Sequence, residues 1–101
     1  MSNLDPHMQI ARKLRSIETA KIELVQQVAE ILRSLKSGSE RDLAKNLGEL
    51  IALAYFIGGQ TGTPLDAIDR AVKDGLPRSL GQEPADAADF ALVLRHIASK
   101  R

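Results

Sequence analysis

Apolar residues recur every three or four positions along the first third of the chain, through Ile10, Leu14, Ile17, Leu24, Val28, Ile31 and Leu35. This spacing places them on one side of an α-helix. The Asp5-Pro6 pair is typical of a helix start, because it combines a capping residue with a proline at the first helical position. The stripe is interrupted once, at Lys21. We therefore expect a break or bend near Ser16, whose side chain could cap a second helix; one long helix is the alternative.

A turn is predicted at Ser37-Gly38-Ser39, which separates two apolar stripes. Gly38 suits the left-handed position just past the end of a helix. Ser39 is followed three residues later by Asp42, which is a variant of the capping box that opens a helix. Two helices joined this tightly fold back on each other. The sequence thus predicts an antiparallel helical hairpin.

The second arm of this hairpin is predicted over residues 40–60, with a stripe of Leu43, Leu47, Leu50, Ile51, Ala54 and Ile57. Ala52, Leu53, Tyr55 and Phe56 widen the stripe beyond one face. A helix that is apolar nearly all round is buried on several sides. One small domain cannot cover so much apolar surface, so we expect a homo-oligomer, either a dimer or a tetramer.

The last third of the chain predicts shorter helices. Thr63-Pro64 repeats the cap-then-proline signal, and Asp74-Gly75 is expected to end that helix. Residues 76–83 are expected to form a loop, and residues 84–99 a last helix. No strand-like alternation occurs. The predicted fold is an all-α, small helical bundle of four to five helices around a central antiparallel hairpin, formed by residues 1–101 as a single domain and completed by oligomerisation.

Composition narrows the classes of function. The chain has 101 residues, with 14 basic and 13 acidic side chains and a net charge of +1. That balance gives no electrostatic surface for nucleic acid, so no nucleic-acid partner is expected. No apolar run approaches the roughly 18 residues that span a bilayer, so no membrane partner is expected. Zero cysteines exclude disulfides and thiolate zinc sites, and favour a cytoplasmic protein.

A candidate cation site follows from the hairpin geometry. Glu30 lies eight residues before Gly38 and Asn46 eight residues after it, so both stand roughly 12 Å from the turn at about 1.5 Å per residue. Gln27 and Glu49 lie three residues further along each arm and also match in height. Oxygen-bearing side chains gathered in this way suit Mg²⁺. The alternative is a polar, solvated face whose charges serve solubility only.

The segment KIELVQQVAEILRSLKSGSERDLAKNLGELIALAYFIGGQTGTPLDAIDRAV, residues 21–72, resembles the MazG-like family within the all-α nucleoside triphosphate pyrophosphohydrolase superfamily. The Gly38-Ser39-Glu40 turn and the Leu47-Gly48-Glu49 step into an apolar run carry the resemblance, which covers roughly residues 9–76. It implies Mg²⁺-dependent cleavage of a nucleoside triphosphate between its α- and β-phosphates.

The chain departs from the acidic pattern of active relatives, which is E-E-x-x-E on the first arm and E-x-x-D on the second. The corresponding positions are Gln26, Gln27 and Glu30, then Asn46 and Glu49. Only two carboxylates therefore remain, because three positions carry neutral amides. Amide oxygens can ligate Mg²⁺ but do not neutralise its charge. The loss of acids also removes candidates for the base that activates water.

Three weaker candidates accompany these positions. Glu23 could act as an outer acid, and Arg70 and Lys73 lie near the region where relatives hold phosphates. No catalytic residue is identified. The sequence favours a divergent, non-catalytic relative that forms homo-oligomers. An active Mg²⁺-dependent nucleotide pyrophosphohydrolase and a helical interaction or adaptor module are the alternatives.

Overall fold

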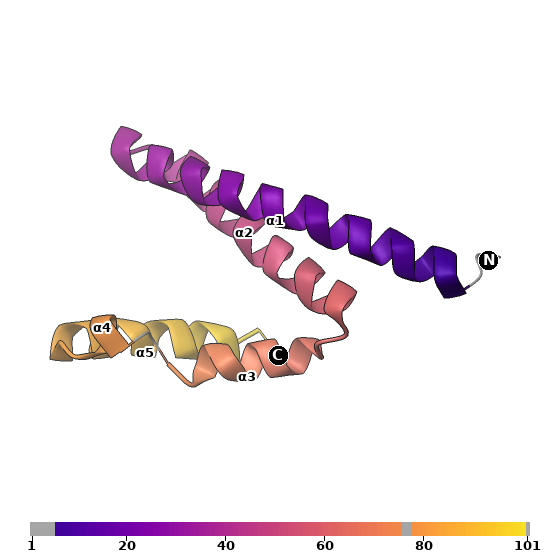
Figure 1. Cartoon of the computed structure of the whole chain (residues 1–101). Helices are drawn as coiled ribbons and strands as arrows, with labels where there is room; N and C mark the ends of the chain where they lie inside the picture. The colour runs from indigo at the N-terminus through magenta and orange to yellow at the C-terminus, as the bar shows by residue number, and fades with distance from the viewer. Residues whose placement is uncertain (1–5, 76–77, 101) are drawn as a thin grey trace. The chain divides into compact units, whose positions relative to one another are not determined.

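A computed structural model describes residues 6–75 and 78–100 of the chain. The described residues form five helices and no strand, which confirms the all-α prediction (Figure 1). The helices are α1 (Pro6–Ser37), α2 (Glu40–Thr61), α3 (Leu65–Lys73), α4 (Arg78–Gly81) and α5 (Pro84–Ala98). None of these helices is both long enough and apolar enough to cross a membrane.

The chain falls into two compact units that divide between Leu65 and Asp66. The first unit is the hairpin of α1 and α2, which pack against each other as the sequence predicts. The second unit contains α4 and α5, which are in contact, and nearly all of α3.

Helix α1 is continuous, so the expected break near Ser16 is wrong. Between Pro6 and Gly38 there is no proline or glycine to interrupt the backbone hydrogen bonds. A serine inside a helix costs only a few tenths of a kcal/mol, at most about 0.7, relative to the best helix formers. Lys21, where the apolar stripe is interrupted, pairs with Glu18 on the surface at 2.9 Å. The helix begins at Pro6 as predicted, whereas the proposed cap Asp5 lies outside the described residues.

The turn between the arms has the predicted chemistry. Gly38 has a φ of 74°, in the left-handed region, and its N–H donates to the Ser34 carbonyl at 3.0 Å. Ser39 is extended at φ −80° and ψ 106°, and its hydroxyl accepts a hydrogen bond from the Asp42 N–H at 3.2 Å. These two local signals fix the direction in which α2 leaves the turn.

The remaining boundaries agree with the sequence except in one place. Helix α3 ends at Lys73, just before the predicted stop, and α5 begins at Pro84. Residues 76–77 of the expected loop over 76–83 lie outside the described residues, and the described part contains the single-turn helix α4. A four-residue helix has no apolar periodicity long enough to detect, which is why the sequence did not reveal it.

The hairpin buries little apolar surface. Among the described residues, Ala20 is the buried hydrophobic residue, and the other buried side chains are polar, namely Gln27 and Ser34. Large aliphatic side chains on both arms remain exposed. A domain of this size needs an apolar interior to offset the entropy of folding. The hairpin does not supply one by itself.

Two opposite faces of the hairpin differ in the exposed residues they carry, as the 3.6-residue period of the helices places them. One face, the apolar face, carries Leu24, Val28 and Leu35 of α1 with Leu47, Ile51 and Tyr55 of α2. The opposite face, the hollowed face, carries Arg12, Arg15, Glu23 and Glu30 of α1 with Glu49 and Phe56 of α2, which line a row of open hollows.

Candidate functional site

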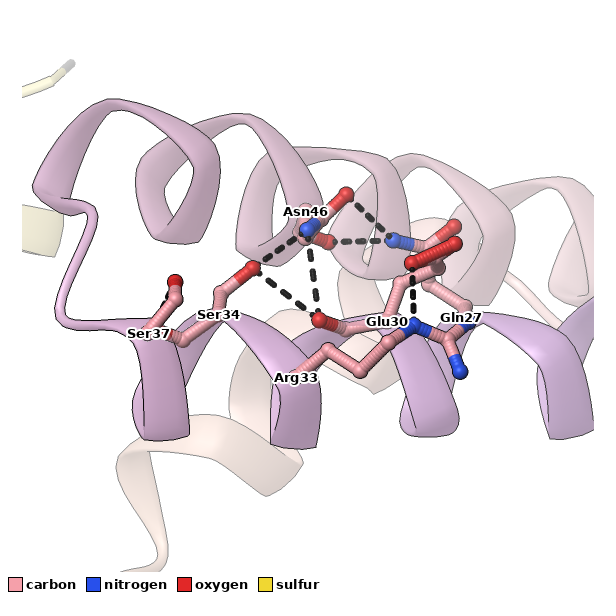
Figure 2. Close-up of polar contacts among 6 residues, drawn as sticks. All are labelled: Gln27, Glu30, Arg33, Ser34, Ser37 and Asn46. Carbon is pink, nitrogen blue, oxygen red and sulfur yellow. Dashed lines mark hydrogen bonds and ion pairs between the residues drawn. The ribbon is translucent and has the colours of Figure 1, made fainter.

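Two amide side chains meet between the arms near the turn. The Gln27 amide nitrogen donates to the Asn46 main-chain carbonyl at 2.9 Å and to the Asn46 side-chain oxygen at 3.4 Å. The Asn46 amide nitrogen donates to the Ser34 hydroxyl at 2.7 Å and to the Glu30 main-chain carbonyl at 3.4 Å. Figure 2 shows these side chains pointing into the space between α1 and α2. We call Gln27, Ser34 and Asn46 the amide cluster.

The amide cluster is a satisfied polar network. The Ser34 hydroxyl, which accepts from Asn46, also donates a hydrogen bond to the Glu30 main-chain carbonyl at 3.0 Å. Within the described residues, every buried side-chain nitrogen or oxygen has a hydrogen-bond partner. Each such bond contributes about 1 kcal/mol, and leaving one partner unpaired in a buried place costs about 1–3 kcal/mol. The cluster therefore fixes the register of α2 against α1.

The two carboxylates of the candidate site are each paired with a cation on their own helix. Glu30 accepts a hydrogen bond from Arg33 Nε at 2.9 Å, and Glu49 lies 3.1 Å from Lys45 Nζ. Both carboxylates are about half exposed. They line one open hollow of about 280 Å³ together with Asp42, Lys45 and Asn46. The structure thus brings Glu30 and Glu49 to the same hollow but leaves each with its own counter-ion.

The residues present do not fit Mg²⁺. That ion takes several oxygen ligands in near-octahedral geometry, whereas the amide groups of Gln27 and Asn46 are engaged in hydrogen bonds between the arms. Among the described residues, no three or more histidine, cysteine, aspartate or glutamate side chains are grouped so that they could hold a metal ion. A cation here would also have to displace Arg33 and Lys45 from the two carboxylates.

The ion pair between Glu30 and Arg33 has a measurable consequence. The hydrogen bond and the charge of Arg33 lower the pKa of Glu30, because both favour the ionised carboxylate. The stabilisation from this ion pair is therefore present at neutral pH and is lost as the pH falls through the lowered pKa of Glu30.

We expect Arg33→Gln to raise the pKa of Glu30, measured by carbon-detected NMR titration of the side chain. Arg41→Gln is the control and should leave the pKa of Glu30 unchanged. If Arg33→Gln also leaves the pKa of Glu30 unchanged, the ion pair between Glu30 and Arg33 is contradicted.

Of the three weaker candidates, one lies beside the main site and two lie in the second unit. Glu23 lines a neighbouring hollow of the hollowed face with Gln27, Glu49 and Phe56. Arg70 and Lys73 occupy the last turn of α3, in the second unit. Their role toward phosphate remains a prediction.

Ser34 is the residue that sequence reasoning missed. Its hydroxyl joins the Asn46 amide to the Glu30 carbonyl, so it completes the amide cluster. The available signal was its spacing, because Ser34 lies seven residues after Gln27 and therefore on the same side of α1. Two polar residues at that spacing on the side facing the second arm indicate a hydrogen-bonded contact.

The comparison with known protein families gives one finding. The model of the MazG-like family matches residues 10–86, which include both arms of the hairpin and continue through α3 and α4 into the start of α5. No curated protein and no solved structure matches the chain.

Proposed function

The chain belongs to the MazG-like family, and from that premise we propose that it is a non-catalytic member that works as a self-associating helical module. The proposal has two parts, the lack of nucleotide chemistry and the association of copies, and different residues support each part.

The amide cluster carries the first part. At positions where active relatives have acids, Gln27 donates a hydrogen bond to Asn46, and Asn46 donates one to Ser34. Their donors are used to tie the arms together, and their neutral oxygens could not offset the charge of a divalent cation. Glu30 and Glu49 are each paired with a cation, and Asp42 is the third carboxylate at their hollow. Within the described residues these three are not grouped so that they could hold a metal ion, so a metal–triphosphate complex would lack the charge balance and the water-activating base that hydrolysis needs.

The apolar face supports the second part. Six large side chains from both arms lie exposed on it, whereas the hairpin buries almost no apolar side chain of its own. Contiguous exposed apolar patches of this kind mark association sites. A second copy offers the same face, so two hairpins can cover each other in a dimer, which can pair again into a tetramer.

An assay of pyrophosphate release tests the first part. We expect no release above the buffer rate from any of a panel of nucleoside triphosphates with Mg²⁺ or Mn²⁺. Glu30→Ala and Glu49→Ala should give the same background. Release by the unaltered chain that disappears in both variants would overturn the proposal and identify an active pyrophosphohydrolase. The placement of Glu30 and Glu49 at one hollow is the observation that favours this second candidate.

A further inference from the structure

A second hollow lies on the hollowed face, further from the turn than the amide cluster. It has a volume of about 450 Å³ and is open to solvent on one side. Helix α1 contributes Arg12 and Arg15, and α2 contributes Leu53 and Phe56; Ser16, Thr19, Ala20 and Glu23 complete the lining. Because this hollow lies opposite the apolar face, self-association through that face leaves it accessible.

The lining of this hollow combines apolar side chains with two positively charged ones. Leu53, Phe56 and Ala20 give the hollow a mainly apolar surface. Arg12 and Arg15 lie three residues apart and so project from the same side of α1. Neither arginine forms an ion pair with any residue that the structure describes, unlike Arg33, which pairs with Glu30. Two guanidinium groups are therefore available beside an apolar surface.

The charge balance of the hollow selects a singly charged ligand. Two arginines and one glutamate, Glu23, leave a net charge of +1. A nucleoside triphosphate carries several negative charges and would meet Glu23 as well as the arginines. A single carboxylate matches the net charge, and its two oxygens match the planar fork of a guanidinium group.

The neighbouring hollows indicate an elongated ligand body. Leu53 and Phe56 also line the next hollow toward the turn, where Ala52 extends the apolar surface and Glu23, Gln27 and Glu49 complete the lining. Arg12 and Arg15 also line a hollow with Met8 and Ala11 on the other side. The arginines thus stand beside an apolar track along the hairpin rather than above a closed pocket. A long alkyl chain follows such a track better than a compact ring system.

We propose that the hollow binds an elongated apolar monocarboxylate, with its carboxylate on Arg12 and Arg15 and its alkyl chain along Leu53 and Phe56. This proposal is independent of the proposed lack of catalysis, because it uses neither Glu30 nor Asn46.

Calorimetric titration of the 101-residue chain with dodecanoate, kept below its aggregation concentration, tests the proposal. We expect saturable binding of one dodecanoate per chain. The double variant Arg12→Gln and Arg15→Gln should lower the affinity about tenfold, since charge-assisted hydrogen bonds are lost. Arg41→Gln is the matched control, because Arg41 is an exposed arginine outside this hollow, and it should bind as the unaltered chain does.

Two further measurements distinguish binding at this site from unspecific adsorption. Dodecyltrimethylammonium, with the same alkyl chain and the opposite charge, should bind at least about tenfold more weakly than dodecanoate. Phe56→Ala, with helicity checked by circular dichroism, should also weaken dodecanoate binding. Absence of saturable binding, equal binding of the cationic analogue, or an affinity unchanged in the double arginine variant would each overturn the proposal.

Discussion

Replacement of Ile51 by aspartate is expected to abolish self-association. Ile51 lies on the apolar face between Leu47 and Tyr55, each one turn away along α2, and is 59% exposed in the single chain. In an assembly formed through this face, the aspartate would be an unpaired charge removed from water. Such a charge costs about 3–5 kcal/mol, and each 1.4 kcal/mol is a factor of ten. We therefore expect the dissociation constant to rise at least about a thousandfold, because symmetry repeats the charge in each copy.

Light scattering coupled to size exclusion measures this effect, and Ile22→Asp is the matched control. Ile22 is an isoleucine with nearly the same exposure, 61%, but it lies outside the apolar face. We expect Ile22→Asp to elute with the mass of the unaltered chain and Ile51→Asp to elute as a monomer. If both variants dissociate equally, or if neither does, the apolar face is not the interface.

Removal of the Gln27 side chain is expected to destabilise the hairpin by about 2 kcal/mol. Gln27→Ala removes the one amide nitrogen that makes both hydrogen bonds to Asn46, and it leaves the Asn46 side-chain oxygen without that partner between the arms. Gln26→Ala is the control, because Gln26 is the adjacent amide and is exposed. A surface change of that kind alters stability by less than about 0.5 kcal/mol.

Urea unfolding of Gln27→Ala, Asn46→Ala and the double variant gives the coupling between the two amides. Residues within one hydrogen-bond network have interaction energies of about 0.5–3 kcal/mol, whereas independent sites add. Non-additive values would support the amide cluster as a structural contact. Equal effects of Gln27→Ala and Gln26→Ala would contradict it.

The local signals of the sequence determine most of the secondary structure. Gly38, Ser39 and Asp42 act through backbone conformation and hydrogen bonds within a few residues, so they place the turn without any tertiary information. The ends of α2 and α3 follow similarly from Gly62 and Gly75, which both have positive φ. The prediction of a break near Ser16 failed because serine is compatible both with a helix cap and with a helix interior, and no nearby glycine or proline decides between the two.

The candidate site was only partly predictable. Counting residues from the turn places Glu30 and Asn46 at one height, because the rise of a helix is fixed. It does not determine which atoms bond, and so it does not reveal that the Asn46 amide contacts Ser34 and the Glu30 carbonyl. The cations paired with the two carboxylates were open to prediction, since Arg33 and Lys45 lie three and four residues from their partners on the same helices.

Self-association is tested most directly by the mass of the 101-residue chain in solution. One chain has a mass of 11.0 kDa. Sedimentation equilibrium at micromolar concentration is expected to give twice or four times that mass. A stable species with the mass of a single chain would contradict the proposed self-associating module.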